Sequence, residues 1–199
     1  MSTYIVNKSV NSEGRKLNFL DVGIHEDVAL ISIEYKISPN NNPFLVFTFE
    51  KDGKKLTHTE YEPKDRDGSI LEEKKLNQIV RLKHIATKFI TEDEFDFESN
   101  DFESFCKTIL SKLKGKFEGK KVRVKVVYSN KNFTTLPKYV PFIESMNVPK
   151  EKSRLEIISI DKMTKDAPDK TEERPNPYKD LVIPESIQTV IDNENDLPF

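Results

Sequence analysis

The sequence contains no tryptophan, a single cysteine, Cys106, and only six glycines among its 199 residues. Because a disulfide joins two cysteines, none can form within the chain, and a reducing compartment is expected. No apolar run approaches the roughly 20 residues that cross a membrane, and the first residues lack the charged-then-apolar pattern of a signal peptide. These absences predict a cytoplasmic protein.

Signatures of catalysis are missing as well. The sequence has no Gly-rich phosphate loop, no Cys/His cluster with metal-ligand spacing and no Ser/His/Asp arrangement. The histidines His25, His58 and His84 are dispersed, and we interpret His58 as a core or edge residue. We therefore expect a protein that is not an enzyme and that needs no metal or other cofactor.

Charge is abundant but unevenly distributed. Charged residues make up 33% of the chain and its formal net charge is −2. Residues 161–199 carry a net charge of −5, which leaves +3 on residues 1–160. A mildly basic body with an acidic, Pro-bearing end predicts a compact domain followed by a flexible acidic tail. The predicted organisation is an arm over 1–22, a domain over 23–160 and a tail over 161–199.

Alternating apolar residues and turn signals predict five strands. The first three span 28–37, 44–50 and 54–62, the last two being joined by the tight Asp52-Gly53 turn. Strands return at 121–128 and at 154–160, with a long loop over 129–153 between them.

Two helices are predicted between the third and fourth strands, within about 69–115. Ser69 with Glu72, and Asn100 with Glu103, have the spacing of capping boxes. Each pair precedes an apolar stripe at helical spacing. The stripes consist of Leu82, Ile85, Ala86 and Phe89, and of Phe102, Phe105, Cys106, Ile109 and Leu113.

This element order predicts an α+β, mainly β fold: a five-stranded OB-type barrel with helices inserted between strands 3 and 4 and a disordered acidic tail. OB-type barrels bind oligonucleotides on the face of strands 2 and 3 and with two flanking loops. A two-residue turn at 52–53 places Phe44 opposite Tyr61 on an open face, and Phe47 opposite His58 in the core. A three-residue bulged turn would exchange the two faces.

Binding of single strands needs rings that stack on bases and cations that follow the phosphates. The open face supplies rings, and the strand at 121–128 has a basic row that we expect to face outward, opposite its apolar row. The long loop adds further rings and lysines. The predicted nucleic-acid-binding residues are Lys36, Phe44, Lys55, Tyr61, Lys121, Arg123, Lys125, Lys131, Phe133, Lys138 and Tyr139. In the alternative interpretation, the basic row is a solvated strand face and the rings pack under the arm, the helices or the loop.

The chain ends with three acidic residues interspersed with asparagines and then a short apolar tip. This end resembles that of bacterial and phage single-stranded DNA-binding proteins, over about eight residues. The resemblance implies that the terminal ring and carboxylate dock on replication proteins such as a polymerase, primase or helicase, while the acidic residues compete with DNA for the groove. It assigns the docking role to Asp192, Glu194, Asp196, Leu197, Pro198 and Phe199. Asn193 and Asn195 interrupt the acidic run, and tryptophan, which many bacterial members use for stacking, is absent; a phage-type member in the host cytoplasm is the closer match.

Two other functions stay open from the sequence. One is a replisome or virion adaptor whose tail docks but whose barrel binds no DNA. The other is a metal-dependent nuclease, because Glu34-Tyr35-Lys36 forms a Glu-x-Lys triplet on a strand. Such nucleases take an acidic ligand from a neighbouring strand, whereas Asp27 lies on or next to the same strand. Oligomeric state is not predicted.

Overall fold

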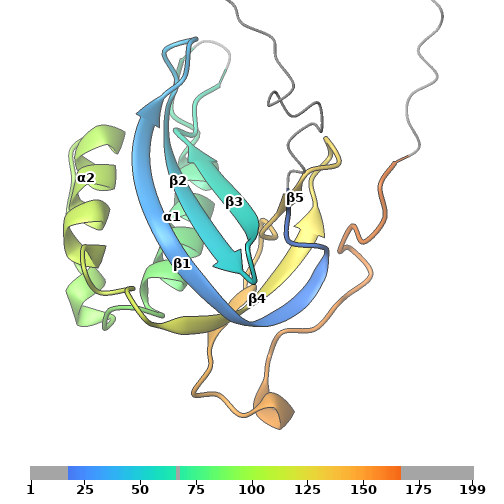
Figure 1. Ribbon diagram of the computed structural model, residues 1–199. Helices are drawn as coiled ribbons and strands as arrows, with labels where there is room; N and C mark the ends of the chain where they lie inside the picture. Colours follow the sequence, from blue (N-terminus) through green and yellow to red (C-terminus); the bar gives the residue numbers. More distant parts are fainter. Residues whose placement is uncertain (1–17, 66–67, 167–199) are drawn as a thin grey trace, which may run out of the picture. The chain divides into compact units, whose positions relative to one another are not determined.

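The computed structural model describes residues 18–65 and 68–166 (Figure 1). The chain divides into two units, Met1–Lys165 and Asp166–Phe199. Of the second unit only Asp166 is described, so the account below concerns the first unit. The residues of the predicted docking tip, 192–199, and most of the predicted arm, 1–22, lie outside the described residues.

The described residues form an α+β fold that is mainly β, as the sequence predicts. The elements are β1 (Gly23–Ile37), β2 (Pro43–Lys51), β3 (Lys54–Tyr61), α1 (Glu72–Ala86), η1 (Asp93–Phe95), α2 (Phe102–Leu113), β4 (Lys121–Tyr128), β5 (Thr134–Thr135), β6 (Ile143–Ser145) and η2 (Lys150–Lys152). Both helices lie between β3 and β4 in the chain, where the insertion was expected.

The strands form one antiparallel sheet in the order β3-β2-β1-β4-β5, with β6 also paired to β4. The bent strand β1 pairs with β2 along one half and with β4 along the other, and its register shifts at two irregular positions (Figure 1). Bulges of this kind increase the local bend of a strand. They allow β1 to join the two halves of the sheet.

The strands do not close into the predicted five-stranded barrel, and the sheet is open between β3 and β5. No backbone ladder joins these two strands in the described part of the chain. A side-chain contact crosses the opening, where His58 Nδ1 lies 3.3 Å from Thr135 Oγ1. Because β5 is only two residues long, it cannot supply the run of backbone groups that a closing ladder needs.

The predicted register of the β2–β3 hairpin is confirmed. Phe44 pairs with Tyr61, and Phe47 pairs with His58. Asp52 and Gly53 both have positive φ, 50° and 75°, as a two-residue hairpin turn of the favoured hand requires. This turn sets the register, and the register decides which face of the hairpin is buried.

The helices pack the predicted apolar stripes into the core. Leu82, Ile85 and Ala86 of α1 are buried, as are Cys106 and Ile109 of α2. Cys106 is fully buried, and this burial raises the pKa of its thiol to about 12. It is a small core residue, as predicted.

Both predicted capping boxes are wrong in detail. Helix α1 begins at Glu72 after Leu71, which makes no side-chain cap, so Ser69 does not cap it. Helix α2 is capped by Asp101, whose Oδ1 accepts from the Ser104 N–H at 2.7 Å, instead of by Asn100. Asp and Asn are both good capping residues. When two of them are adjacent, the path of the preceding chain decides which one caps the helix.

The strand predicted over 154–160 is absent, and the predicted loop over 129–153 contains β5 and β6. Side chains form hydrogen bonds with backbone groups of this segment that would otherwise pair with a neighbouring strand. Glu144 Oε1 accepts from Arg154 N at 3.1 Å, and Lys125 Nζ donates to Glu156 O at 3.0 Å. This irregular segment, residues 153–162, is called the C-terminal strap below. Within the described residues, no helix has the length and apolar character to cross a membrane.

Candidate nucleic-acid interface

Three predicted residues form a row across β1, β2 and β3. Lys36 pairs with Phe44, and Phe44 pairs with Tyr61. Residues directly opposite each other in a sheet have their side chains on the same face. The ring centroids of Phe44 and Tyr61 are 4.9 Å apart with a 35° angle between the ring planes, and Tyr61 is 52% exposed. This pair, called the aromatic platform below, offers a ring surface to solvent.

The remainder of this face is mostly polar, as expected. Thr48 lies opposite Thr57, and Glu50 lies opposite the exposed Lys55 at the hairpin end. Val46 departs from the prediction, because only 7% of it is exposed. Lys36 forms an ion pair with Glu34 at 2.9 Å. Exposed surface pairs of this type contribute little energy, so a phosphate can compete for this lysine.

The Glu34-Tyr35-Lys36 triplet therefore has its two charged members paired with each other. Across residues 18–65 and 68–166 there is no group of three or more His, Cys, Asp or Glu side chains that could hold a metal ion.

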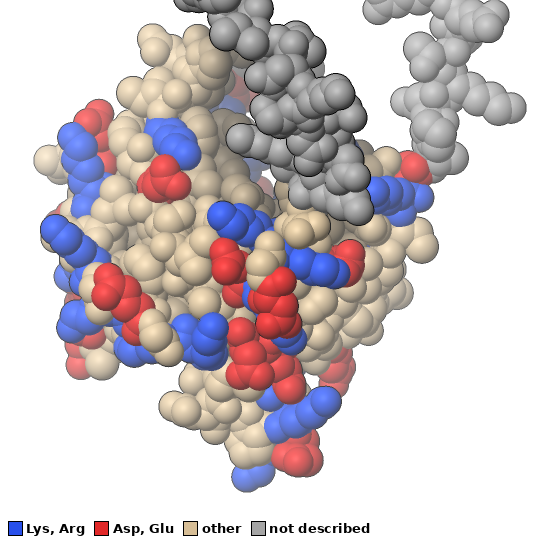
Figure 2. Space-filling model, viewed as in Figure 1, with Lys and Arg blue, Asp and Glu red and all other residues tan. Residues whose placement is uncertain are grey.

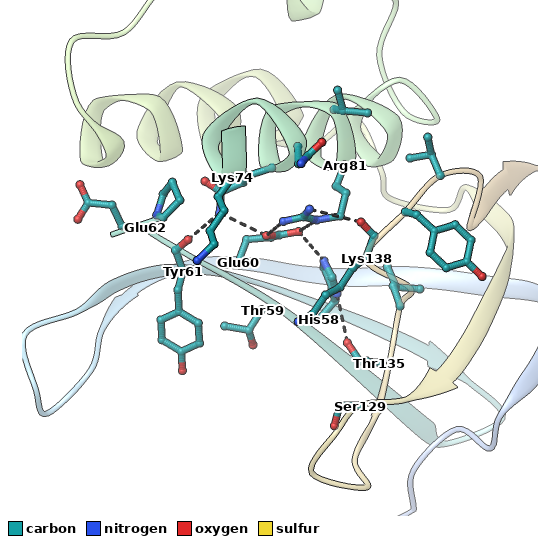
Figure 3. Close-up of a pocket in the computed structure, with 17 residues that line it drawn as sticks. His58, Thr59, Glu60, Tyr61, Glu62, Lys74, Arg81, Ser129, Thr135 and Lys138 are labelled. Atoms are coloured by element: carbon teal, nitrogen blue, oxygen red, sulfur yellow. Dashed lines mark hydrogen bonds and ion pairs between the residues drawn. The ribbon is translucent and has the colours of Figure 1, made fainter. Parts of the chain in front are cut away.

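A groove of about 820 Å³ opens beside the aromatic platform, between β3, α1 and the segment after β5 (Figure 3). We call it the β3–α1 groove. Tyr61, Lys138 and Tyr139, which the sequence predicts to bind nucleic acid, line it together. It was not expected that α1 would contribute Lys74, Asn77 and Arg81. Their spacing of three and four residues places them on one helical face, and that polar face is the signal that could have identified them.

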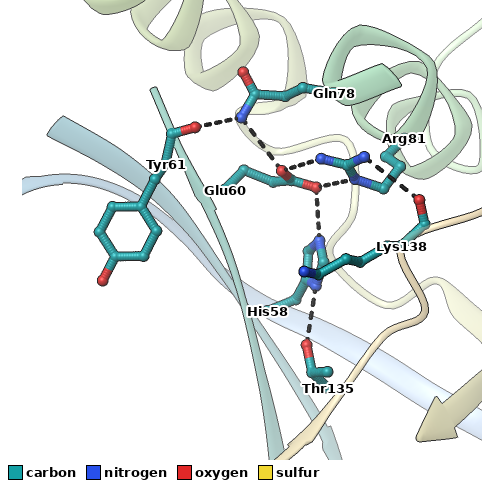
Figure 4. A network of polar contacts seen from close by, with 7 residues as sticks. All are labelled: His58, Glu60, Tyr61, Gln78, Arg81, Thr135 and Lys138. Carbon is teal, nitrogen blue, oxygen red and sulfur yellow. Dashed lines mark hydrogen bonds and ion pairs between the residues drawn. The ribbon is translucent and has the colours of Figure 1, made fainter. Parts of the chain in front are cut away.

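A buried carboxylate forms the floor of this groove (Figure 4). Glu60 of β3 accepts from Arg81 Nε at 2.6 Å and from Arg81 Nη2 at 2.7 Å. His58 Nε2 lies 3.0 Å from Glu60 Oε1, and Gln78 donates to Tyr61 O at 2.7 Å. Burial opposes the charged carboxylate, but the hydrogen bonds from Arg81 and His58 outweigh it and lower the pKa of Glu60 to about 2. The network holds one face of α1 against the edge strand β3.

The basic row predicted on β4 is mostly not exposed. Only Lys121 lies at the surface, whereas Arg123 is 4% and Lys125 is 2% exposed. The prediction that Arg123 and Lys125 point to solvent is wrong, because β6 and the C-terminal strap cover this side of β4. Arg123 Nη1 donates to Glu144 Oε2 at 2.8 Å, and Lys125 Nζ lies 3.0 Å from Asp161 Oδ2. Both cations form ion pairs with carboxylates inside the fold.

The loop residues divide into free and fixed side chains. Lys131 and Lys138 are exposed, and Phe133, in the turn between β4 and β5, is 66% exposed. The Tyr139 hydroxyl donates to Asp161, and Lys125 Nζ lies 4.7 Å from the centre of its ring. Tyr139 is thus pinned against the C-terminal strap while one side of it borders the groove.

Basic and acidic side chains are interleaved on the face shown in Figure 2, and the described residues form no continuous basic band in that view. No protein-family model matches the chain, and no curated protein matches its sequence.

Proposed function

We propose that this protein binds single-stranded DNA without sequence preference and brings replication proteins to it through the C-terminal tip. The observation that carries the proposal is the aromatic platform. Phe44 and Tyr61 lie together on a mostly polar face, with Lys36 next to them in the same row. Bases of any kind stack on such rings, and a nearby ammonium attracts the phosphates.

The strand arrangement supports the same function. OB-type barrels are partly open and bind oligonucleotides across strands 2 and 3, between the loops after strands 1 and 4. Here β2 and β3 carry the platform, and the turn after β4 carries Lys131 and Phe133. The proposed contact set is Lys36, Phe44, Lys55, Tyr61, Lys121, Lys131, Phe133, Lys138 and Tyr139. Arg123 and Lys125 do not belong to it, because their charges are already paired.

Partner recruitment rests on the sequence of residues 192–199, which lie outside the described residues. A terminal ring next to a free carboxylate provides an apolar and an anionic anchor for a basic-rimmed pocket. Removing residues 192–199 is expected to abolish recruitment and to leave DNA affinity equal or higher. A weaker affinity after this deletion would contradict the proposed competition between tail and DNA.

The central test is fluorescence anisotropy of a labelled oligo-dT across a salt series, with duplex DNA of equal length as competitor. Tight binding should weaken with salt by about 0.7 log units per log unit of salt for each phosphate neutralised. Tyr61→Ala should weaken binding by about 5-fold to 150-fold, since stacking contributes ~1–3 kcal/mol per base.

Two variants control this experiment. Tyr61→Phe keeps the ring and should bind like the wild type. Leu76→Ala removes an exposed apolar side chain from α1, outside the residues that line the groove, and should leave binding unchanged. Equal affinity of Tyr61→Ala and Leu76→Ala would remove the platform from the proposal.

One observation favours the adaptor as a second candidate. Arg123 and Lys125 are held by carboxylates, and charges of both signs are interleaved on the face in Figure 2. An adaptor would show no oligo-dT binding at low salt but would still capture replication proteins through residues 192–199.

A further inference from the structure

The aromatic platform and the β3–α1 groove share Tyr61, so the two surfaces are adjacent. The groove's volume of about 820 Å³ falls within the range of ligand sites, roughly 300–1,000 Å³. We propose that the groove is a nucleotide-binding site, in which the base meets the edge of β3 and the phosphate lies between Lys74 and Lys138. This inference rests on the proposed function and adds a binding site to it.

The edge of β3 has unused hydrogen-bonding capacity at this point. Lys55 N donates to Asn18 O, and Lys55 O accepts from Leu20 N, each at 2.9 Å. In an antiparallel pair, every second residue directs its N–H and C=O to the same side, so Thr57, Thr59 and Tyr61 share the outward orientation of Lys55. Tyr61 O receives the Gln78 amide.

Thr59 lies between these bonded positions and lines the groove. Within the described part of the chain, its outward N–H and C=O have no hydrogen-bond partner. One residue thus presents a donor and an acceptor side by side, which is the arrangement that complements the polar edge of a base.

The charges of the groove suit a phosphate. Arg81 is neutralised by Glu60, and Glu62 pairs with Lys64 at 2.6 Å. Lys74 from α1 and Lys138 from the segment after β5 reach into the space between these elements (Figure 3). Neither ammonium forms an ion pair with a described residue. They are therefore the uncompensated charges of the groove, and a phosphate between them would supply the missing anion.

The groove differs from the platform in what it can recognise. Stacking accepts every base, because every base has a π-face. A base edge against a backbone N–H and C=O is accepted only where its donors and acceptors match. The β3–α1 groove thus accounts for any preference among bases, while the platform accounts for general affinity.

The test measures oligo-dT affinity across a salt series for the wild type, for Lys74→Gln/Lys138→Gln, and for Lys107→Gln/Lys114→Gln. The last variant removes two exposed positive charges from α2 and its C-terminal cap, outside the groove. All four lysines are at the surface, so both variants should fold. The groove variant should lose at least 10-fold in affinity at low salt, and the log–log salt slope should become less steep by about 0.7, because the two lysines hold one phosphate. The control variant should match the wild type in slope.

A second measurement maps the contact directly. An oligonucleotide carrying 5-bromodeoxyuridine is cross-linked by light and the modified residues are identified by mass spectrometry. Cross-links to Tyr61 and to Tyr139, the rings that border the groove, would support the site. Cross-links to Tyr61 alone would place the strand on the platform only and would overturn the proposed groove site.

The outcomes separate this inference from the proposed function. Wild-type binding with equal slopes for the two double variants overturns the groove and leaves the platform. No wild-type binding overturns both. A titration with thymidine monophosphate distinguishes a bound strand from a bound free nucleotide. If loss of Lys74 and Lys138 weakens binding of the mononucleotide but leaves oligo-dT affinity unchanged, the groove is not part of the path of the strand, and the inference is overturned.

Discussion

The guanidinium of Arg81 on α1 donates hydrogen bonds to both carboxylate oxygens of Glu60 on the edge strand β3, with N–O distances of 2.6 Å and 2.7 Å. Only 4% of Glu60 is exposed, and His58 contacts the same carboxylate from its other side. This pair joins a helix to an edge strand that no neighbouring strand covers in the described part of the chain. It also forms the floor of the β3–α1 groove, so the groove's shape depends on it.

Arg81→Ala is expected to lower the free energy of unfolding by about 3–5 kcal/mol, because it leaves a buried carboxylate without its cation. Urea denaturation measures the change. Lys83→Ala, on the same helix, removes a cation from an exposed pair with Glu92 and should change stability by about 0.5 kcal/mol or less. Similar denaturation midpoints for the two variants would show that the Glu60–Arg81 pair does not stabilise the fold.

Acid should weaken the same network in a defined pH window. The pKa of Glu60 is about 2 in the folded protein against an ordinary value of 4.5, so the unfolded state binds the proton more tightly. The stabilisation is complete above pH 4.5 and is lost as the pH falls toward 2, a loss on the order of 3 kcal/mol. Unfolding free energies of the wild type and Glu60→Gln, measured across this range, should converge as the pH falls. A constant difference would contradict this assignment.

His84 should make stability sensitive to a higher pH window. Burial is the main cause that lowers the pKa of His84 to about 4, with the nearby positive charges of Lys88 and Arg154 adding to it. The neutral ring accepts from the Phe142 N–H at 3.3 Å. Because the folded pKa lies below the ordinary 6.5, the contribution of His84 to stability is present above pH 6.5 and is lost as the pH falls toward 4.

The measurement is thermal unfolding of the wild type and His84→Gln from pH 7 to pH 4. The wild type should lose more stability over this range than the variant, which has no group titrating at position 84. Parallel curves would show that His84 is charged or solvated in the fold.

The pair of Lys125 and Asp161 should show strong energetic coupling. Their side chains are 2% and 1% exposed, and Asp161 also accepts from Ile158 N at 2.9 Å. Lys125→Met and Asp161→Asn should each destabilise the protein by about 3–5 kcal/mol, since each leaves one buried charge unpaired. The double variant should lose clearly less than the sum of the two, and a double-mutant cycle in urea measures the difference. Additive losses would mean that the C-terminal strap is held to β4 by other contacts.

Local features of the sequence were sufficient for much of the fold. The Asp52-Gly53 turn selects a two-residue hairpin, and its register then decides that Phe44 and Tyr61 share the open face while Phe47 and His58 are buried. The apolar stripes of α1, which ends at Ala86, and of α2, which ends at Leu113, each have one buried side for a similar reason, because their spacing repeats with the helix. The aromatic platform of the candidate site was predictable on these grounds, since all its determinants lie within one hairpin.

Tertiary structure alone decided that both sides of β4 are buried. The alternation of Lys121, Arg123 and Lys125 with valines is typical of a half-exposed strand, yet β6 and the C-terminal strap cover the basic side and supply Glu144 and Asp161 as partners. The β3–α1 groove likewise needs the segment after β5 to meet β3 and α1, and this segment lies far from both in the sequence. Turn type and periodicity are determined by neighbouring residues. Burial of a charge and the walls of a groove depend on distant segments, whose positions no local pattern specifies.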